Sequence, residues 1–114
     1  MSEQTTTAPV VRRVDDRHRY EILVDDHRAG LTAYRDRDGR RVFFHTEVDD
    51  AYAGRGLAAI LVEQALTDVR ASGLRIVPVC PYVARFLTEH REFADITDPA
   101  TPEVLTWLDA RLGR

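Results

Sequence analysis

The chain has 114 residues, the length of one domain, and its 44% hydrophobic and 31% charged residues are typical of a soluble globular protein. Its formal net charge of -3 and pI near 5.8 provide no broad basic face, so we expect neither nucleic acid nor an anionic membrane as a partner. No apolar stretch reaches the roughly 18 residues that span a bilayer, the N-terminus lacks a signal-peptide pattern, and one cysteine forms no internal disulfide, so we expect a cytoplasmic protein.

The domain is expected to begin near residue 13. The start of the chain is polar, rich in threonine and without a hydrophobic period, so we predict a disordered tail over residues 1–12. Residues 13–114 are then expected to form a single domain, because no linker and no internal repeat divides them.

An antiparallel meander is predicted for the first half of this domain. Apolar side chains alternate over residues 20–24 and again over 31–35, and a third strand is expected over 42–48. Asp38 and Gly39 are typical of a hairpin turn between the second and third strands, because both residues tolerate positive φ. Short turns join the three strands, which therefore pair antiparallel.

The middle of the chain changes to a helical period. Apolar residues fall at Leu57, Leu61, Ala65 and Val69, which places them on one face of a helix. The β-branched run over 74–80 predicts a buried strand. Strand, helix and strand form a crossover, so this fourth strand is expected to lie parallel to the third.

Two further helices are predicted at the C-terminal end. Pro81 has the favoured first position of a helix that ends near His90. Thr101 is the expected N-cap of the next helix, and either Trp107 or the leucine side of that helix, which includes Leu108, is expected to pack on the sheet. The elements together predict an α/β fold, with a mixed sheet built from the meander and the crossover and with packed C-terminal helices.

A glycine-rich turn, Ala53 to Ala59, stands between the third strand and the long helix. Glycines let the backbone approach a ligand, and the free N–H groups in the first turn of a helix bind anions such as phosphate. An ordinary loop uses the same residues, so the turn alone leaves both interpretations open. It also matches the GxGxxA dinucleotide pattern, but a meander precedes it and no acidic residue ends the next strand.

The single cysteine stands directly before a predicted helix. Cys80 precedes Pro81, so its sulfur is expected near a helix N-terminus, whose partial positive charge favours the nucleophilic thiolate. Free cysteine is also among the most buried residues and packs as a small apolar side chain. A redox role is less favoured, because the chain has no second cysteine to resolve an oxidised one.

Three polar side chains near these motifs are candidates for proton transfer. His45 and Glu47 alternate at the end of the third strand and so share a face, from which either can take a proton from an amine. Solvated polar residues at a strand end are the alternative. Tyr82 can donate a proton to a leaving thiolate or can be half-buried packing. The histidines show no metal-ligand spacing, so we expect no metal.

Taken together, these motifs resemble one protein family. The similarity runs from about Tyr20 to Ile96 and is carried by "HTEV" before the glycine-rich turn, by its distance to "VPVCPYV", and by the "EHREF" that follows. This set resembles the minimal, single-domain branch of the GNAT acyltransferase superfamily. The resemblance implies an acetyl-CoA-binding fold in which two parallel strands splay apart and the pantetheine arm lies between them like an extra strand. Pro78 lies in one of those strands, which gives its missing N–H a rationale.

The resemblance places the cofactor on the glycine-rich turn. In the family pattern, Gln or Arg opens this motif; Ala53 stands there instead, so a side chain is missing while binding by main-chain N–H groups is retained. Asp49 and Asp50 are expected to repel a diphosphate unless they point away. The residues implied to bind the cofactor are Val48, Gly54, Arg55, Gly56, Leu57, Ala58 and Ala59.

Two catalytic schemes follow from the resemblance. Either an amine attacks the thioester directly while Glu47 or His45 takes its proton, or Cys80 accepts the acetyl group first and passes it on, with Tyr82 as the implied general acid. We therefore expect an N-acetyltransferase with acetyl-CoA as substrate and an unidentified amine, a small molecule or a protein amino group, as acceptor. The alternative is a non-catalytic acyl-CoA-binding module or sensor.

Overall fold

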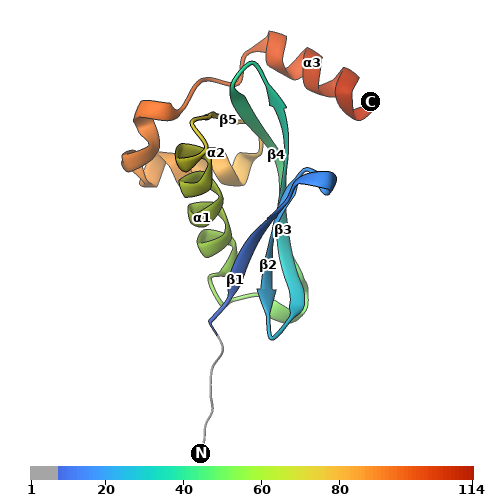
Figure 1. Cartoon of the computed structure of the whole chain (residues 1–114), viewed down its shortest axis with the longest axis vertical. Coiled ribbons are helices and arrows are strands. Elements are labelled where there is room, and N and C mark those ends of the chain that lie inside the picture. Colours follow the sequence, from blue (N-terminus) through green and yellow to red (C-terminus); the bar gives the residue numbers. More distant parts are fainter. Residues whose placement is uncertain (1–7) are drawn as a thin grey trace, which may run out of the picture.

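Five strands form one mixed sheet in the computed structural model, which describes residues 8–114 (Figure 1). They lie side by side in chain order: β1 Val10–Val14, β2 Arg19–Val24, β3 His27–Arg37, β4 Arg40–Val48 and β5 Arg75–Pro78. The helices are α1 Leu57–Ala71, α2 Pro81–Glu89 and α3 Pro102–Leu112, with short 3-10 turns η1 Asp15–Arg17, η2 Asp50–Tyr52 and η3 Arg91–Ile96. This arrangement confirms the predicted α/β fold with a mixed sheet.

The predicted meander is confirmed, and its second strand is longer than expected. β2, β3 and β4 pair antiparallel, and Asp38 and Gly39 link the last two with φ of 54° and 78°. β3 begins at His27 because Asp25 and Asp26, with φ of 52° and 68°, make a two-residue turn directly after β2. Aspartate tolerates the left-handed backbone conformation that a tight turn needs, so the chain reverses within two residues and β3 pairs with β2 from His27 onward.

The prediction of a disordered tail over residues 1–12 is wrong at its C-terminal end. Residues 10–12 belong to β1, which pairs antiparallel with β2 in the register Val10 to Leu23 and Val14 to Arg19. The sequence Val-Val-Arg-Arg-Val does not alternate, so its own pattern does not indicate a strand. Pairing with β2 makes this segment a strand. Val11 packs against the main hydrophobic core, which lies between the sheet and the helices α1 and α2. Residues 1–7 of the predicted tail lie outside the described residues.

The crossover through α1 places β5 parallel to β4, as predicted. β5 covers Arg75–Pro78, a shorter range than the expected 74–80, because the chain turns toward α2 directly after it. On the other side of β5, Ile76 bridges Thr97, and its carbonyl accepts the Asp98 amide at 2.8 Å. The short strand is therefore held from both sides.

Helices α1 and α2 cover one face of the sheet, and α3 lies on the other (Figure 1). Leu108 of α3 packs on Val42 and Val77, with Trp107 and Leu112 partly buried against them, so the helix packs on the sheet through both of the predicted alternatives, while Leu105 stays exposed. Thr101 caps this helix as predicted, since its hydroxyl accepts the Val104 amide. Among the described helices, none combines the length and apolar character needed to cross a bilayer.

A buried charge network ties four strands to α1. The Arg41 guanidinium, 7% exposed, donates twice to Asp36 at 2.8 and 2.9 Å and once to the Tyr20 hydroxyl at 2.7 Å. That hydroxyl donates to Asp68 of α1 at 2.5 Å, and Arg13 of β1 reaches the same carboxylate at 2.9 Å. Burial and Asp68 raise the pKa of Tyr20, so the phenol stays protonated. A buried cation needs such partners to be tolerated.

We predict that Arg41→Gln destabilises the fold far more than Arg40→Gln does. The first variant leaves Asp36 and the Tyr20 hydroxyl without their cation, a loss of about 2 to 3 kcal/mol. Arg40 is the matched control, because its ion pair with Asp98 is at the surface and is worth less than about 1 kcal/mol. Urea unfolding followed by circular dichroism measures both free energies. Equal losses in the two variants would contradict the role of the network.

Asp98 is predicted to make the fold sensitive to acid. Arg75 and Arg40 donate to its carboxylate at 2.9 and 2.8 Å and lower its pKa to about 2. Because this folded-state pKa lies below the ordinary value of about 3.9, the stabilisation is complete above about pH 4 and is lost as the pH falls toward 2. Asp98→Asn is expected to lose less stability than the unchanged protein over that range in urea unfolding. An equal loss of unfolding free energy in Asp98→Asn and in the unchanged protein between about pH 4 and about pH 2 would contradict this role of Asp98.

Candidate functional site

The glycine-rich turn between β4 and α1 is open beside its backbone. Gly54 and Gly56 have φ of 82° and 70°, in the left-handed region that other residues rarely adopt. A Cβ atom at either position would meet nothing within 4 Å. The turn therefore leaves room for a bound group, as its predicted role requires.

The amides that open α1 precede the first hydrogen bond of the helix. Gly56 is the N-cap, no side chain of the described residues caps it, and Ile60 donates to its carbonyl at 3.4 Å. The N–H groups of Leu57, Ala58 and Ala59 lie in the first turn, before this bond, where a helix offers no internal acceptor. Together with the helix dipole they form an end suited to an anion.

Charged side chains of both signs flank this turn. The Arg55 guanidinium lies 5.3 Å from the centre of the Tyr52 ring. Asp49 and Asp50 precede the turn, and their carbonyls accept the amides of Tyr52 and Ala53. Both aspartate side chains are exposed, so water and salt screen the repulsion that the sequence predicts for a diphosphate.

β4 and β5 separate before β4 reaches the turn. Their parallel pairing runs from Arg40 with Arg75 to Phe43 with Pro78 and stops there. The Phe43 carbonyl accepts two amides, from Val79 at 2.9 Å and from Cys80 at 2.8 Å. Pro78 alternates with Val79, so the N–H that proline lacks would have pointed away from β4. In the described chain, residues 44–48 of β4 have no partner strand on this side. The two parallel strands thus diverge, and the free edge of β4 leads to the open turn.

Cys80 lies where the two strands part. It is the N-cap of α2, with Pro81 at the first helical position as predicted. It is 4% exposed and packs in the main core, and its thiol donates to the Thr46 hydroxyl of β4 at 3.4 Å. Thr46 is in turn 2.9 Å from the Thr32 hydroxyl. The sulfur therefore has both features that the sequence left open: it stands at a helix N-terminus, and it is buried.

His45 and Glu47 lie on the opposite face of β4 from Cys80. They alternate with Thr46, which contacts the sulfur, so their side chains point away from it. Their Nε2 and Oε1 atoms are 2.7 Å apart, and the side chains are 54% and 50% exposed. The structure thus brings the two predicted proton acceptors together but places the sheet between them and Cys80. Residues 8–114 contain no group of three or more His, Cys, Asp or Glu placed to hold a metal ion.

Tyr82 lies in the first turn of α2 and is 38% exposed. Partial burial and the nearby Glu89 carboxylate raise its pKa above the ordinary value, against the opposite effect of Arg85. A raised pKa keeps the phenol protonated, as a proton donor must be.

Two residues that the sequence analysis did not single out shape this region. Gly30 pairs with Val48, and a Cβ at Gly30 would lie 2.6 Å from the Glu47 carbonyl oxygen, so β3 approaches β4 closely only because this residue is glycine. A glycine inside an alternating strand is the signal that could have indicated it. Thr46 stands between the two predicted residues of "HTEV", and alternation alone would have put it on the face opposite theirs.

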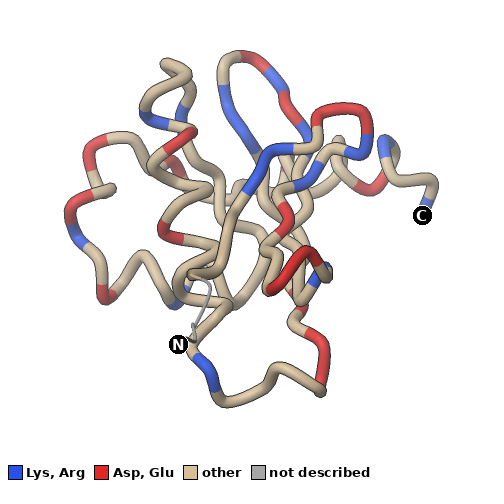
Figure 2. Tube along the Cα trace, turned by 60° about the horizontal axis from the view of Figure 1, so that its bottom comes forward, with Lys and Arg blue, Asp and Glu red and all other residues tan. Residues whose placement is uncertain are grey.

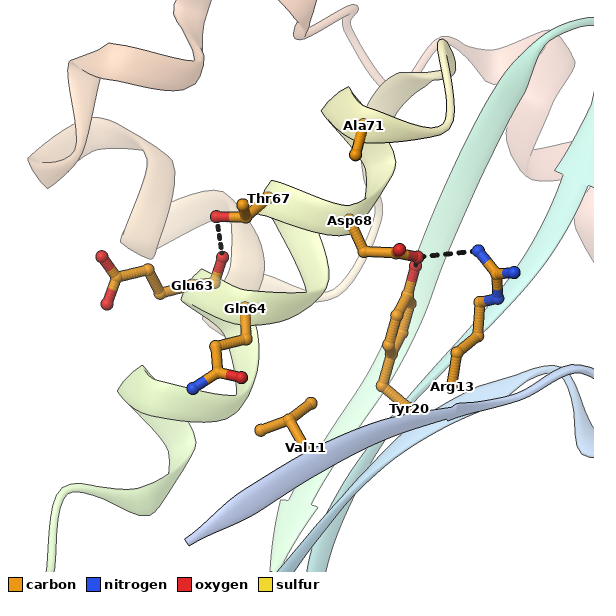
Figure 3. A pocket seen from close by; sticks show the side chains of 8 residues that line it. All are labelled: Val11, Arg13, Tyr20, Glu63, Gln64, Thr67, Asp68 and Ala71. Atoms are coloured by element: carbon orange, nitrogen blue, oxygen red, sulfur yellow. Dashed lines mark hydrogen bonds and ion pairs between the residues drawn. The ribbon is translucent and has the colours of Figure 1, made fainter. Parts of the chain in front are cut away.

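A separate groove of 670 Å³ lies between β1 and α1 (Figure 3). Arg13 from β1 and Asp68 from α1 form an ion pair across it, and the Tyr20 hydroxyl meets the same carboxylate. Its lining residues come from β1, β2 and α1, and none of them belongs to the glycine-rich turn, β4 or α2. The groove is therefore distinct from the region where β4 and β5 diverge.

A mixed sheet with diverging parallel strands beside an open helix N-terminus defines an N-acetyltransferase-like fold. The family of GCN5-related N-acetyl-transferases matches residues 19–96, well over half of the chain. The protein belongs to this family. The family and the fold together support a role in acyl transfer.

Individual relatives are similar over different parts of the chain. Protein NATD1 from Bos taurus is 46% identical over 46 residues, which are 40% of this chain and 41% of NATD1, so less than half of that relative is spanned. A GCN5-like protein from Staphylococcus aureus, solved by NMR, superposes with a TM-score of 0.61 over 82% of this chain and 91% of its own, and at 18% identity this is a similarity of fold. Ard1 from Thermoplasma volcanium reaches a TM-score of 0.46 at 14% identity over 50% of this chain and 39% of its own.

Proposed function

We propose that this protein is an acetyl-CoA-dependent N-acetyltransferase that moves an acetyl group to an amine. The observation that carries the proposal is the free edge of β4 over residues 44–48, which leads to the open turn and the first amides of α1. An extended pantetheine arm would give the free backbone groups of β4 hydrogen-bond partners, as a further strand does. The diphosphate would then lie at the helix end.

In this proposal the turn holds the cofactor mainly through its backbone. The amides from Gly54 to Ala59 surround the diphosphate, and Arg55 adds a positive charge. Val48 is the last residue of β4 and marks where the arm would leave the sheet. No glutamine or arginine side chain is needed at Ala53, because the main-chain N–H groups do the binding.

The pair of His45 and Glu47 supports direct attack by the amine. The amine nitrogen forms a bond to the thioester carbonyl carbon, and the C–S bond to CoA breaks. The proton lost by the nitrogen passes to Glu47 or His45, and the departing thiolate takes a proton from Tyr82. An amine can reach the half-exposed pair from solvent, whereas the Cys80 sulfur is buried, so we favour this route.

The second route passes through Cys80. Its sulfur would attack the thioester carbon, release CoA, and carry the acetyl group until the amine displaces it. The position of Cys80 at the start of α2, where β4 and β5 part, supports this route, and its burial opposes it.

Free CoA is expected when the protein is incubated with acetyl-CoA and a panel of primary amines. Glu47→Gln should lower kcat/KM at least about a hundredfold, because it removes a proton acceptor. The Cys80→Ala variant should keep a kcat/KM within about tenfold of that of the unchanged protein. Mass spectrometry of the intact, unchanged protein after exposure to acetyl-CoA should show no acetyl adduct. An adduct on Cys80 together with an inactive Cys80→Ala variant would establish the second route. Binding of CoA without its release from acetyl-CoA by any amine would identify a binding module or sensor.

A matched pair of glycine variants tests the cofactor site separately. Gly54→Ala and Gly39→Ala both place a side chain at left-handed φ in open space, so each should cost about 1 kcal/mol of stability. Only Gly54 lies at the proposed diphosphate site, and its Cβ would occupy the room of the ligand. Isothermal titration calorimetry should show CoA binding weakened about tenfold or more by Gly54→Ala and unchanged by Gly39→Ala. If both variants bind CoA with unchanged affinity, the diphosphate does not bind at this turn.

A further inference from the structure

The sheet face opposite α1 and α2 carries polar residues that the proposed reaction does not fully use. The strand register puts Arg19, Ala33 and His45 in one cross-strand row, and Glu21 and Glu47 in the next row, on either side of β3. Arg35 follows Ala33 on the same side of β3. We name this set the open-face patch: Arg19, Glu21, Ala33, Arg35, His45 and Glu47.

Neighbouring residues fix the face on which this patch lies. Thr32 and Tyr34, which alternate with Ala33 and Arg35, are buried on the α1 side, where Tyr34 belongs to the main core and Thr32 contacts Thr46. Ala33 and Arg35 therefore point to the other side. The α3 helix covers that side at the end near Val42, the cross-strand partner of Arg35, and the remainder, from Ala33 and His45 onward, is free of helices in the described chain (Figure 1).

The two guanidinium groups of the open-face patch, balanced in number by two carboxylates, differ in how they are paired. Acidic and basic segments alternate along the whole trace (Figure 2). Glu21 is shared by two arginines, Arg19 at 2.7 Å and Arg12 at 3.3 Å. For Arg35, no carboxylate of residues 8–114 lies within ion-pair distance, and its guanidinium contacts the Tyr34 carbonyl at 3.5 Å.

The spacing of the patch suits a small molecule with two polar ends. Adjacent strands lie about 4.8 Å apart, so Arg19 and His45 stand about 10 Å apart across Ala33. Arg35 is the diagonal neighbour of His45, at about 7 to 8 Å, within reach of a long side chain. Ala33 places only a methyl group between Arg19 and His45, whereas on β4 the extra residue Phe44, which packs on the α3 side, lies between His45 and the Val42 that pairs with Arg35. A carboxylate over Ala33 would meet one or both guanidiniums while an amine a few bonds away meets Glu47.

We infer that the acceptor is an amine that carries a carboxylate, and that Arg35, together with Arg19, binds this carboxylate while the His45–Glu47 pair receives the amine. The inference rests on the proposed function and gives the acceptor its chemical class. Arginine binds carboxylates with two parallel hydrogen bonds, which fixes the orientation of the bound molecule. The same guanidiniums repel an acceptor that carries a second positive charge. Arg35 is thus a specificity-determining residue that contacts the unreactive end of the acceptor.

Three amines of similar length but different charge test the inference: γ-aminobutyrate, butylamine and putrescine. Release of CoA from acetyl-CoA should be most efficient with γ-aminobutyrate and least efficient with putrescine. Arg35→Gln should raise KM for γ-aminobutyrate roughly ten- to a hundredfold with little change in kcat, and should leave butylamine within about twofold. Arg35→Lys should restore part of the loss. Arg28→Gln, on the same strand but outside the patch, is the control and should change neither substrate.

The outcomes separate this inference from the proposed function. If CoA is released but γ-aminobutyrate is not preferred, or if Arg35→Gln affects γ-aminobutyrate and butylamine equally, the inference is wrong and the acetyltransferase proposal stands. If no amine releases CoA, the acetyltransferase proposal is wrong, and NMR titration of the CoA-saturated protein with γ-aminobutyrate decides the patch alone. Shifts at the amides of Ala33 and Arg35, lost in Arg35→Gln, support the inference, and their absence overturns it.

Discussion

The region proposed for acyl transfer depends on where the parallel pairing of β4 and β5 stops. One carbonyl, that of Phe43, takes the amides of both Val79 and Cys80, so the Cys80 amide turns back to Phe43 and does not continue the ladder along β4. β4 runs on without a partner on that side, while the chain beyond β5 turns into α2. The free strand edge, the cysteine at the start of α2 and the path to the open turn all result from this one interruption.

The sheet also divides the candidate chemistry between its two faces. On the face covered by α1 and α2, Cys80 is buried against Thr46, and on the other face His45 and Glu47 are hydrogen-bonded to each other and half exposed. Gly30 has no Cβ, so the backbone of β3 can lie close to the Glu47 carbonyl of β4, and this close packing holds the backbone of Glu47 in place. A reaction that needs access from solvent is therefore better served by the exposed face.

Stability in this small chain comes from parts that lie away from the proposed cofactor turn. The buried Arg41 joins β4 to Tyr20 and, through it, to the second half of α1, and Asp98 holds the two arginines of β4 and β5. The start of α1, by contrast, is left without a side-chain cap, and its turn is built on left-handed glycines. The ends of the same helix thus differ: one is tied into the fold, and the other is open to a ligand.

The sequence by itself determined the meander, α1, the crossover and the two C-terminal helices, because periodicity and capping are local properties of the chain. It also singled out the glycine-rich turn, Cys80, His45 and Glu47, but it missed β1, which is a strand through its pairing with β2. Only the tertiary structure decided which side chains share a face. The pairing of β3 with β4 skips Phe44, so this extra residue reverses the alternation after the buried Phe43 and turns His45 and Glu47 outward. Register with a neighbouring strand sets such a bulge, and a single sequence does not contain that register.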